Sequence, residues 1–172
     1  MPAGICYGAS DVPLAHDPGD CADRLRALLP AHYRLVSSPA QRCLRLAELL
    51  HDAPRVDARL RELDFGEWEM RGFTDIPRAY IDAWAADPLV FRPPGGETVA
   101  EMRVRVLAGL DDLSKYADDA VVIVAHGGPL RVIAGALLGP PAGEWMRMQF
   151  EYGRATRIDV EHGTAGLVWH DR

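Results

Sequence analysis

The chain has 172 residues, of which 48% are hydrophobic and 26% charged, a composition typical of a globular protein with one substantial core. The 19 Lys and Arg against 25 Asp and Glu give a net charge of −6, which disfavours non-specific nucleic-acid binding. No stretch reaches the length of a membrane span, and the N-terminus lacks the pattern of a signal peptide. We therefore expect one cytoplasmic domain over residues 1–172, with neither a membrane nor a nucleic-acid partner.

The first half of the chain predicts two helices and two strands. Residues 20–29 have helical spacing of apolar side chains, and 33–37 reads as a short buried strand. Ser38 is expected to cap a helix that runs through Leu50. Residues 55–57 are expected to form a small edge strand.

The second half continues the alternation. Thr74 is expected to cap a short helix, residues 88–97 read as a loop, and Thr98 is expected to start a longer amphipathic helix. The apolar run at 121–125 predicts a strand, followed by a helix that ends at Gly139.

The last segment predicts a β-hairpin that turns at His162 and Gly163. Because strands alternate with helices through the rest of the chain, the fold class is α/β. We expect a three-layer α/β/α domain with a mostly parallel mixed sheet.

Two strand ends carry candidate functional residues. The strand 121–125 leads directly into His126 and Gly127, and the strand 33–37 leads into a helix that carries Arg42. In such sheets, ligands bind beyond the carboxyl ends of the strands, where helix N-termini and an arginine suit an anion such as phosphate. The alternative for each residue is structural, since a lone histidine can bond a loop and a helical arginine is usually solvated.

The acidic stretch LRELDFGEWEMRG, residues 60–72, carries a third candidate. Glu62 precedes the apolar Leu63, and partial burial there would raise the pKa of its carboxyl and suit it to general acid catalysis. The alternative is a solvated acidic loop. No P-loop, nucleophile elbow or metalloprotease motif is present, so we expect no metal and no cofactor.

The cysteines and the other histidines support no further site. The three cysteines include no C-x-x-C pair, so reduced thiols are expected. The remaining histidines show no spacing typical of metal ligands: His16, His32, His51, His162 and His170.

Four blocks together resemble the histidine phosphatase (phosphoglycerate-mutase-like) superfamily: SSPAQRCLRLAELL, ELDFGEWE, FRPPGGETVAEMRVRV and VVIVAHGGPLR. The opening GICYGASDVPLA is similar to small bacterial phosphatases related to α-ribazole phosphatase. The resemblance implies transfer through a covalent phosphohistidine, without a metal. It implies the following roles: Arg42 clamps phosphate, Glu62 donates a proton, His126 assists beside the Gly127 amide, and Tyr7 and Gly8 contact substrate.

The chain departs from this pattern at two places. The family's nucleophile lies in an Arg-His-Gly triplet at the end of a first strand, and the sequence has no such triplet before Gly4. We therefore expect an N-terminally truncated domain whose sheet lacks that strand and whose natural reading frame starts upstream. Rearrangement, or a strand from a partner chain, are the alternatives. Met70 stands where the family usually has glycine.

The expected function is that of a phosphomonoesterase acting on a small phosphate ester, inactive in this chain because the nucleophile is absent. The alternatives are a noncatalytic phosphate-ligand binder and a phosphoglycerate mutase. The expected partner is a small phosphorylated substrate, and the sequence leaves a homodimer open.

Overall fold

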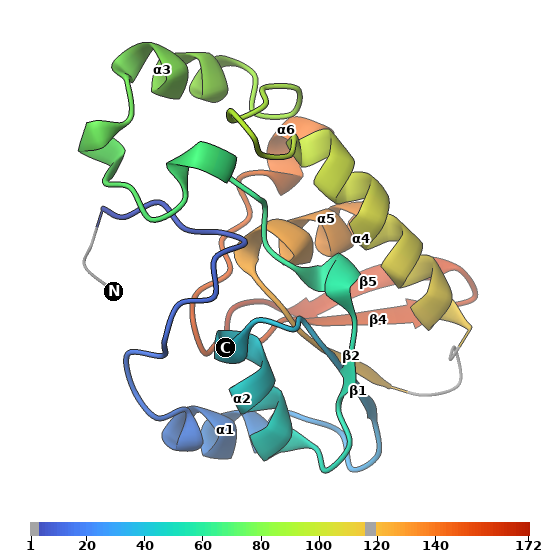
Figure 1. Cartoon of the computed structure of the whole chain (residues 1–172). Helices are drawn as coiled ribbons and strands as arrows, with labels where there is room; N and C mark the ends of the chain where they lie inside the picture. Colours follow the sequence, from blue (N-terminus) through green and yellow to red (C-terminus); the bar gives the residue numbers. More distant parts are fainter. Residues whose placement is uncertain (1–3, 116–119) are drawn as a thin grey trace.

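The computed structural model describes residues 4–115 and 120–172 (Figure 1). Its elements in chain order are α1 (Gly19–Arg26), β1 (Arg34–Ser37), α2 (Gln41–Leu50), β2 (Arg55–Val56), the 3₁₀ turns η1 (Ala58–Leu60), η2 (Gly66–Trp68) and η3 (Phe73–Asp75), α3 (Arg78–Ala86), α4 (Val99–Ser114), β3 (Val121–Val124), α5 (Gly127–Leu138), α6 (Ala142–Trp145), β4 (Arg157–Glu161) and β5 (Thr164–Trp169). None of the helices in this part of the chain is both long and apolar enough to cross a bilayer.

The central sheet is parallel, in the order β2-β1-β3, which confirms the α/β fold class. The register aligns Leu35 with Val122 and Val36 with Ile123. Since the strands are parallel, the carboxyl ends of β1 and β3 lie at the same edge of the sheet. Ser38 and His126, the residues just beyond those ends, are both buried.

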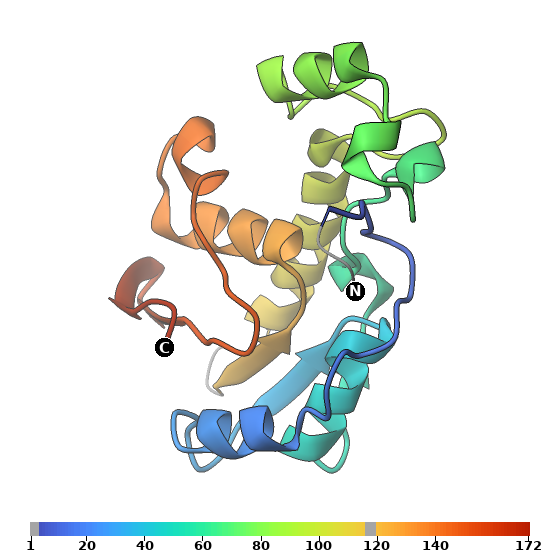
Figure 2. The same cartoon turned by 90° about the vertical axis from the view of Figure 1, so that its left-hand side faces the viewer.

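Alternating side chains on the strands build the three layers. Leu35, Val122 and Val124 pack into a core cluster with α1 and α2. Val36 and Ile123 point to the opposite face, where they join the cluster built from α4 and α5. Figure 2 shows the two pairs of helices on opposite sides of the sheet.

The C-terminal strands form the predicted hairpin. His162 and Gly163 both have positive φ, at 49° and 78°, as a tight hairpin turn with a type I′ backbone requires. The hairpin β4-β5 is a second, antiparallel sheet, and within the described ranges no strand pairs with the edge of β3 opposite β1. All four residues of β3 are half-buried, although the strand is wholly apolar.

One predicted helix start and one predicted helix end are confirmed, and two predicted helix starts are wrong. Thr98 and Glu101 form a reciprocal capping box at the start of α4, and Gly139 ends α5 in the left-handed conformation. Ser38 does not cap α2, because the first amide of that helix, at Gln41, donates to Asp11 Oδ1 at 2.8 Å. Thr74 likewise caps no helix.

The segment after Thr74 is a short 3₁₀ turn, and α3 begins only at Arg78, after Pro77. Proline at this place disfavours helix in the residue before it, which explains the later start. Ile76 is buried there against Trp68 and Cys6 in a small apolar cluster of its own. The loop predicted over residues 88–97 contains neither helix nor strand.

Candidate phosphate-binding site

A cavity of about 150 Å³ lies at the edge of the sheet where β1 and β3 end. The structure brings three residues with predicted catalytic roles, Arg42, Glu62 and His126, to this one cavity, together with Gly8. These four residues come from four separate segments of the chain. The structure shows that they converge, and their catalytic roles are predictions. The lining residues are Gly8, Ala9, Asp11, Pro39, Ala40, Arg42, Arg61, Glu62 and His126.

His126 is held by both of its ring nitrogens. Arg42 Nε lies 3.2 Å from Nδ1, and Ser38 Oγ lies 2.8 Å from Nε2. Because a guanidinium N–H can only donate, Nδ1 accepts, and the proton of the neutral ring is assigned to Nε2, which donates to Ser38. Burial, followed by the charges of Arg42 and Arg105, lowers the pKa of His126 to about 3, so the ring is neutral at pH 7.

Cys43 packs against the same ring. Its Sγ lies 3.6 Å from His126 Nε2 and 3.3 Å from the carbonyl oxygen of Ala125. Burial raises the pKa of the Cys43 thiol to about 12, although the nearby Arg42 opposes this. The sulfur is therefore a protonated core group at neutral pH and not a nucleophile. Cys6, Cys21 and Cys43 are all free, as predicted.

Arg42 makes three hydrogen bonds within the protein. Besides its bond to His126, it donates from Nη1 to the Ser10 carbonyl at 2.8 Å and from Nη2 to the Gly8 carbonyl at 2.6 Å. The guanidinium lies over the ring of Tyr7, 5.6 Å from its centroid. A guanidinium has five N–H bonds, so two of them have no acceptor among the described residues.

Glu62 joins its loop to the start of α5. Its Oε2 accepts from the Gly128 amide at 3.1 Å, and its Oε1 accepts from the Leu63 amide at 2.9 Å. A Cβ on Gly128 would lie 2.2 Å from Glu62 Oε1, so a larger residue there would push the Glu62 carboxylate aside. The helix N-terminus of α5 thus faces a carboxylate that belongs to the protein.

Arg105 of α4 secures the chain segment that carries Glu62. It donates to the carbonyl oxygens of Arg59 and Arg61 at 2.7 Å each and of Glu62 at 3.0 Å. It also forms an ion pair with Glu97. All five of its N–H bonds are used in this way, so the backbone before Glu62 is rigidly placed.

The predicted substrate-contact residues are only partly at the cavity. Gly8 lines it, whereas Gly127 does not, and it is the next amide, Gly128, that faces Glu62. Tyr7 does not line the cavity. Its ring lies against the Arg42 guanidinium, and its hydroxyl is 3.4 Å from that of Tyr152. Tyr152, a residue that is 93% exposed, was not predicted as part of the site.

Other site residues were also missed. Asp11 and Arg61 line the cavity, and Ser38 Oγ accepts the hydrogen bond from His126 Nε2. Asp11 could have been suspected, since an aspartate commonly satisfies a helix N-terminus, but its reach across the chain to α2 is not visible in sequence. Arg61 directly precedes Glu62, and a cation next to a predicted catalytic carboxyl could have indicated that it belongs to the site.

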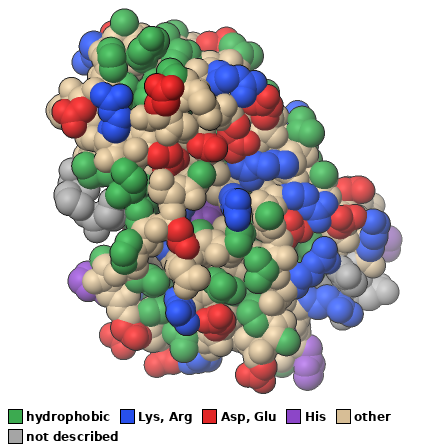
Figure 3. All heavy atoms as spheres, in the orientation of Figure 1, with side chains coloured by type: hydrophobic (Ala, Val, Ile, Leu, Met, Phe, Trp, Pro, Cys, Tyr) green, Lys and Arg blue, Asp and Glu red, His purple; other side chains and the backbone are tan. Residues whose placement is uncertain are grey.

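The surface charge around the site is uneven. Figure 3 shows Lys and Arg side chains gathered along α4 and the adjacent η1, and acidic side chains around η2 and the start of α4. The net charge of −6 therefore does not describe the local potential, and two arginines line the cavity itself.

Comparison with known proteins gives a matching family model and similar relatives. A family model described as "Histidine phosphatase superfamily (branch 1)" matches residues 2–171. The chain is 29% identical, over 96% of its length and 87% of the relative, to the adenosylcobalamin/alpha-ribazole phosphatase of Salmonella typhimurium. It is 31% identical, over 90% of its length and 76% of the relative, to a protein of Enterobacter sp. described as a probable phosphoglycerate mutase.

The fold has a counterpart among solved structures. The crystal structure of the alpha-ribazole phosphatase from Shigella flexneri superposes with a TM-score of 0.88 at 26% identity, covering 98% of this chain and 89% of that one. The three-layer arrangement with a parallel central sheet is therefore that of phosphoglycerate-mutase-like proteins.

Proposed function

The chain belongs to the histidine phosphatase superfamily, and we propose that its cavity binds the phosphoryl group of a small phosphate monoester. The convergence of Arg42, Glu62 and His126 on one cavity carries this proposal. A volume of about 150 Å³ is roughly half that of the smallest usual ligand pockets, so it suits the phosphoryl group, with the rest of the ester outside.

The lining residues supply suitable groups for such a ligand. Arg42 and Arg61 provide positive charge for phosphoryl oxygens, and two N–H bonds of Arg42 remain available. Glu62 lies in the same cavity, where its carboxyl can protonate the oxygen of a departing alcohol. The neutral ring of His126 holds the Arg42 guanidinium by accepting from Nε.

Hydrolysis by the phosphohistidine route needs a histidine nitrogen that attacks phosphorus as the ester P–O bond breaks. Water then cleaves the P–N bond and releases orthophosphate. Among the described lining residues His126 is the only histidine, and both of its nitrogens are engaged by Arg42 and Ser38. This observation favours the second candidate, a noncatalytic phosphate-ligand binder, for the 172-residue chain.

A panel of phosphate monoesters tests both candidates. Binding is measured by calorimetry, turnover by orthophosphate release, and any phosphohistidine by its acid-labile label after incubation with ³²P-labelled ester. We expect ester binding that competes with orthophosphate, with very slow release and no labelled protein. Rapid release would contradict the noncatalytic assignment, and no binding of any ester would contradict the proposed function itself.

A further inference from the structure

The segment Gly8–Ser10 lies between a carboxylate and a guanidinium. On one side its three successive amides donate to Glu69: Gly8 at 3.0 Å, Ala9 at 3.0 Å and Ser10 at 3.1 Å. On the other side two of its carbonyls accept from Arg42, at 2.6 Å from Gly8 and 2.8 Å from Ser10. The one segment therefore links the two charges.

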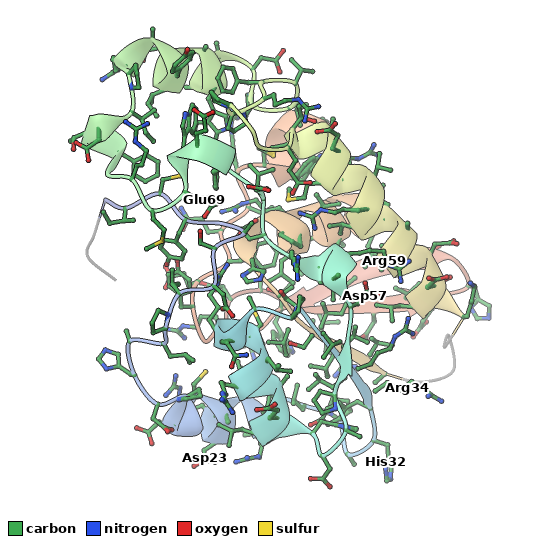
Figure 4. The ribbon with its side chains drawn as sticks, viewed as in Figure 1. Asp23, His32, Arg34, Asp57, Arg59 and Glu69 are labelled. Carbon is green, nitrogen blue, oxygen red and sulfur yellow. The ribbon has the colours of Figure 1, made fainter. Side chains whose placement is uncertain are left out.

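Glu69 is a built-in anion for these amides. Its Oε1 also accepts from the Phe65 amide at 3.0 Å, so backbone donors from two stretches of chain converge on one carboxylate. Burial opposes its ionisation, but the bonds from Ser10, Gly8 and Phe65 outweigh burial and hold the pKa of Glu69 below its ordinary value. Figure 4 places Glu69 between the turn η2 and the N-terminal segment.

This geometry reaches the cavity through Arg42. The positions of the Gly8 and Ser10 carbonyls determine where Nη1 and Nη2 lie, and the bond from Nε to His126 completes the orientation of the guanidinium plane. Glu69 itself does not line the cavity. A long arginine side chain without such contacts would lose rotamer freedom each time a ligand bound, at a cost in affinity.

We infer that Glu69 is a positioning residue, which orients the Arg42 guanidinium toward a bound phosphoryl group by holding the segment Gly8–Ser10. The inference rests on the proposed function in one respect, namely that Arg42 binds phosphate. It adds a second, remote carboxylate on which phosphate affinity depends.

A double-mutant cycle separates positioning from general support of the fold. Glu69→Gln replaces one acceptor oxygen by an amide group that cannot accept from the segment's N–H groups. Arg42→Lys keeps the charge but loses the planar fork that bonds both carbonyls. Orthophosphate binding to the full chain and to each variant is measured by calorimetry.

We expect Glu69→Gln to weaken orthophosphate binding about tenfold in the otherwise unsubstituted chain and less than about twofold when Arg42 is already lysine. Equal weakening in both backgrounds would overturn the inference, because a structural effect is additive. Glu67→Gln, an exposed neighbour in the same turn, is the matched control and should leave binding unchanged. Glu69→Asp, which keeps the charge but is shorter, should weaken binding by an intermediate factor.

A second readout does not depend on phosphate. The Arg42 Nε–H signal in a ¹⁵N NMR spectrum reports the bond to His126, and Glu69→Gln should shift or broaden it while Glu67→Gln should not. An unchanged signal would refute the positioning role. If the unsubstituted chain bound no orthophosphate, the proposed function would fail, and this signal would still decide whether Glu69 orients Arg42.

Discussion

Acidification should destabilise the protein through His126. The pKa of this ring is lowered from 6.5 to about 3 in the folded chain, chiefly by burial. Between these values the unfolded state binds a proton that the folded state does not bind, so the stability present above pH 6.5 is lost as pH falls toward 3. At pH 4.5, two pH units below the ordinary pKa, the loss is about 3 kcal/mol.

Urea unfolding followed by tryptophan fluorescence at pH 7 and pH 4.5 measures this loss. His126→Gln provides the control, because an uncharged amide can still bond Ser38 and accept from Arg42. The remaining titratable groups titrate equally in both proteins. The difference between the two pH dependences of the unfolding free energy therefore gives the contribution of the His126 ring. The unsubstituted chain should lose about 3 kcal/mol more than the variant. Equal losses would show that His126 is not a buried neutral ring held as described.

Three further substitutions have definite expected results. Met70 has a φ of 63°, so Met70→Gly should raise the free energy of unfolding by up to about 1 kcal/mol in urea titrations, and a decrease would contradict strain at this turn. Thr98→Ala removes the capping box of α4 and should cost about 1 kcal/mol, measured as a lower urea midpoint with an unchanged slope. Gly128→Ala should displace the Glu62 carboxylate from the cavity and alter phosphate-ester affinity in calorimetry, whereas unchanged affinity would remove Glu62 from the site.

Local signals predicted most of the fold. The strand through Ser37 and the capping residue Thr98 follow from apolar periodicity and side-chain chemistry within a few residues. The predicted cap of α2 was wrong because the first amide of the helix donates to Asp11, about 30 residues earlier in the chain. Nothing in a local pattern shows which distant carboxylate will reach an open helix N-terminus.

The candidate site, like the fold, has parts that the sequence predicts and parts that it does not. Arg42 and His126 could be found because each follows a strand end, where the topology of a parallel sheet brings side chains together. The contacts that orient them could not be found. Ser38 and Gly128 each act through one hydrogen bond, and Glu69 through several, between segments remote in sequence. Such bonds depend on backbone positions that only the folded chain defines.

A crystal structure of the chain with orthovanadate, which resembles a phosphoryl group in transfer, tests the binding site most directly. The oxyanion should lie in the cavity within hydrogen-bond distance of Arg42 and close to Glu62 and His126. An ordered vanadate bound elsewhere, or an empty cavity at saturating vanadate, would contradict the assignment of this cavity to a phosphoryl group.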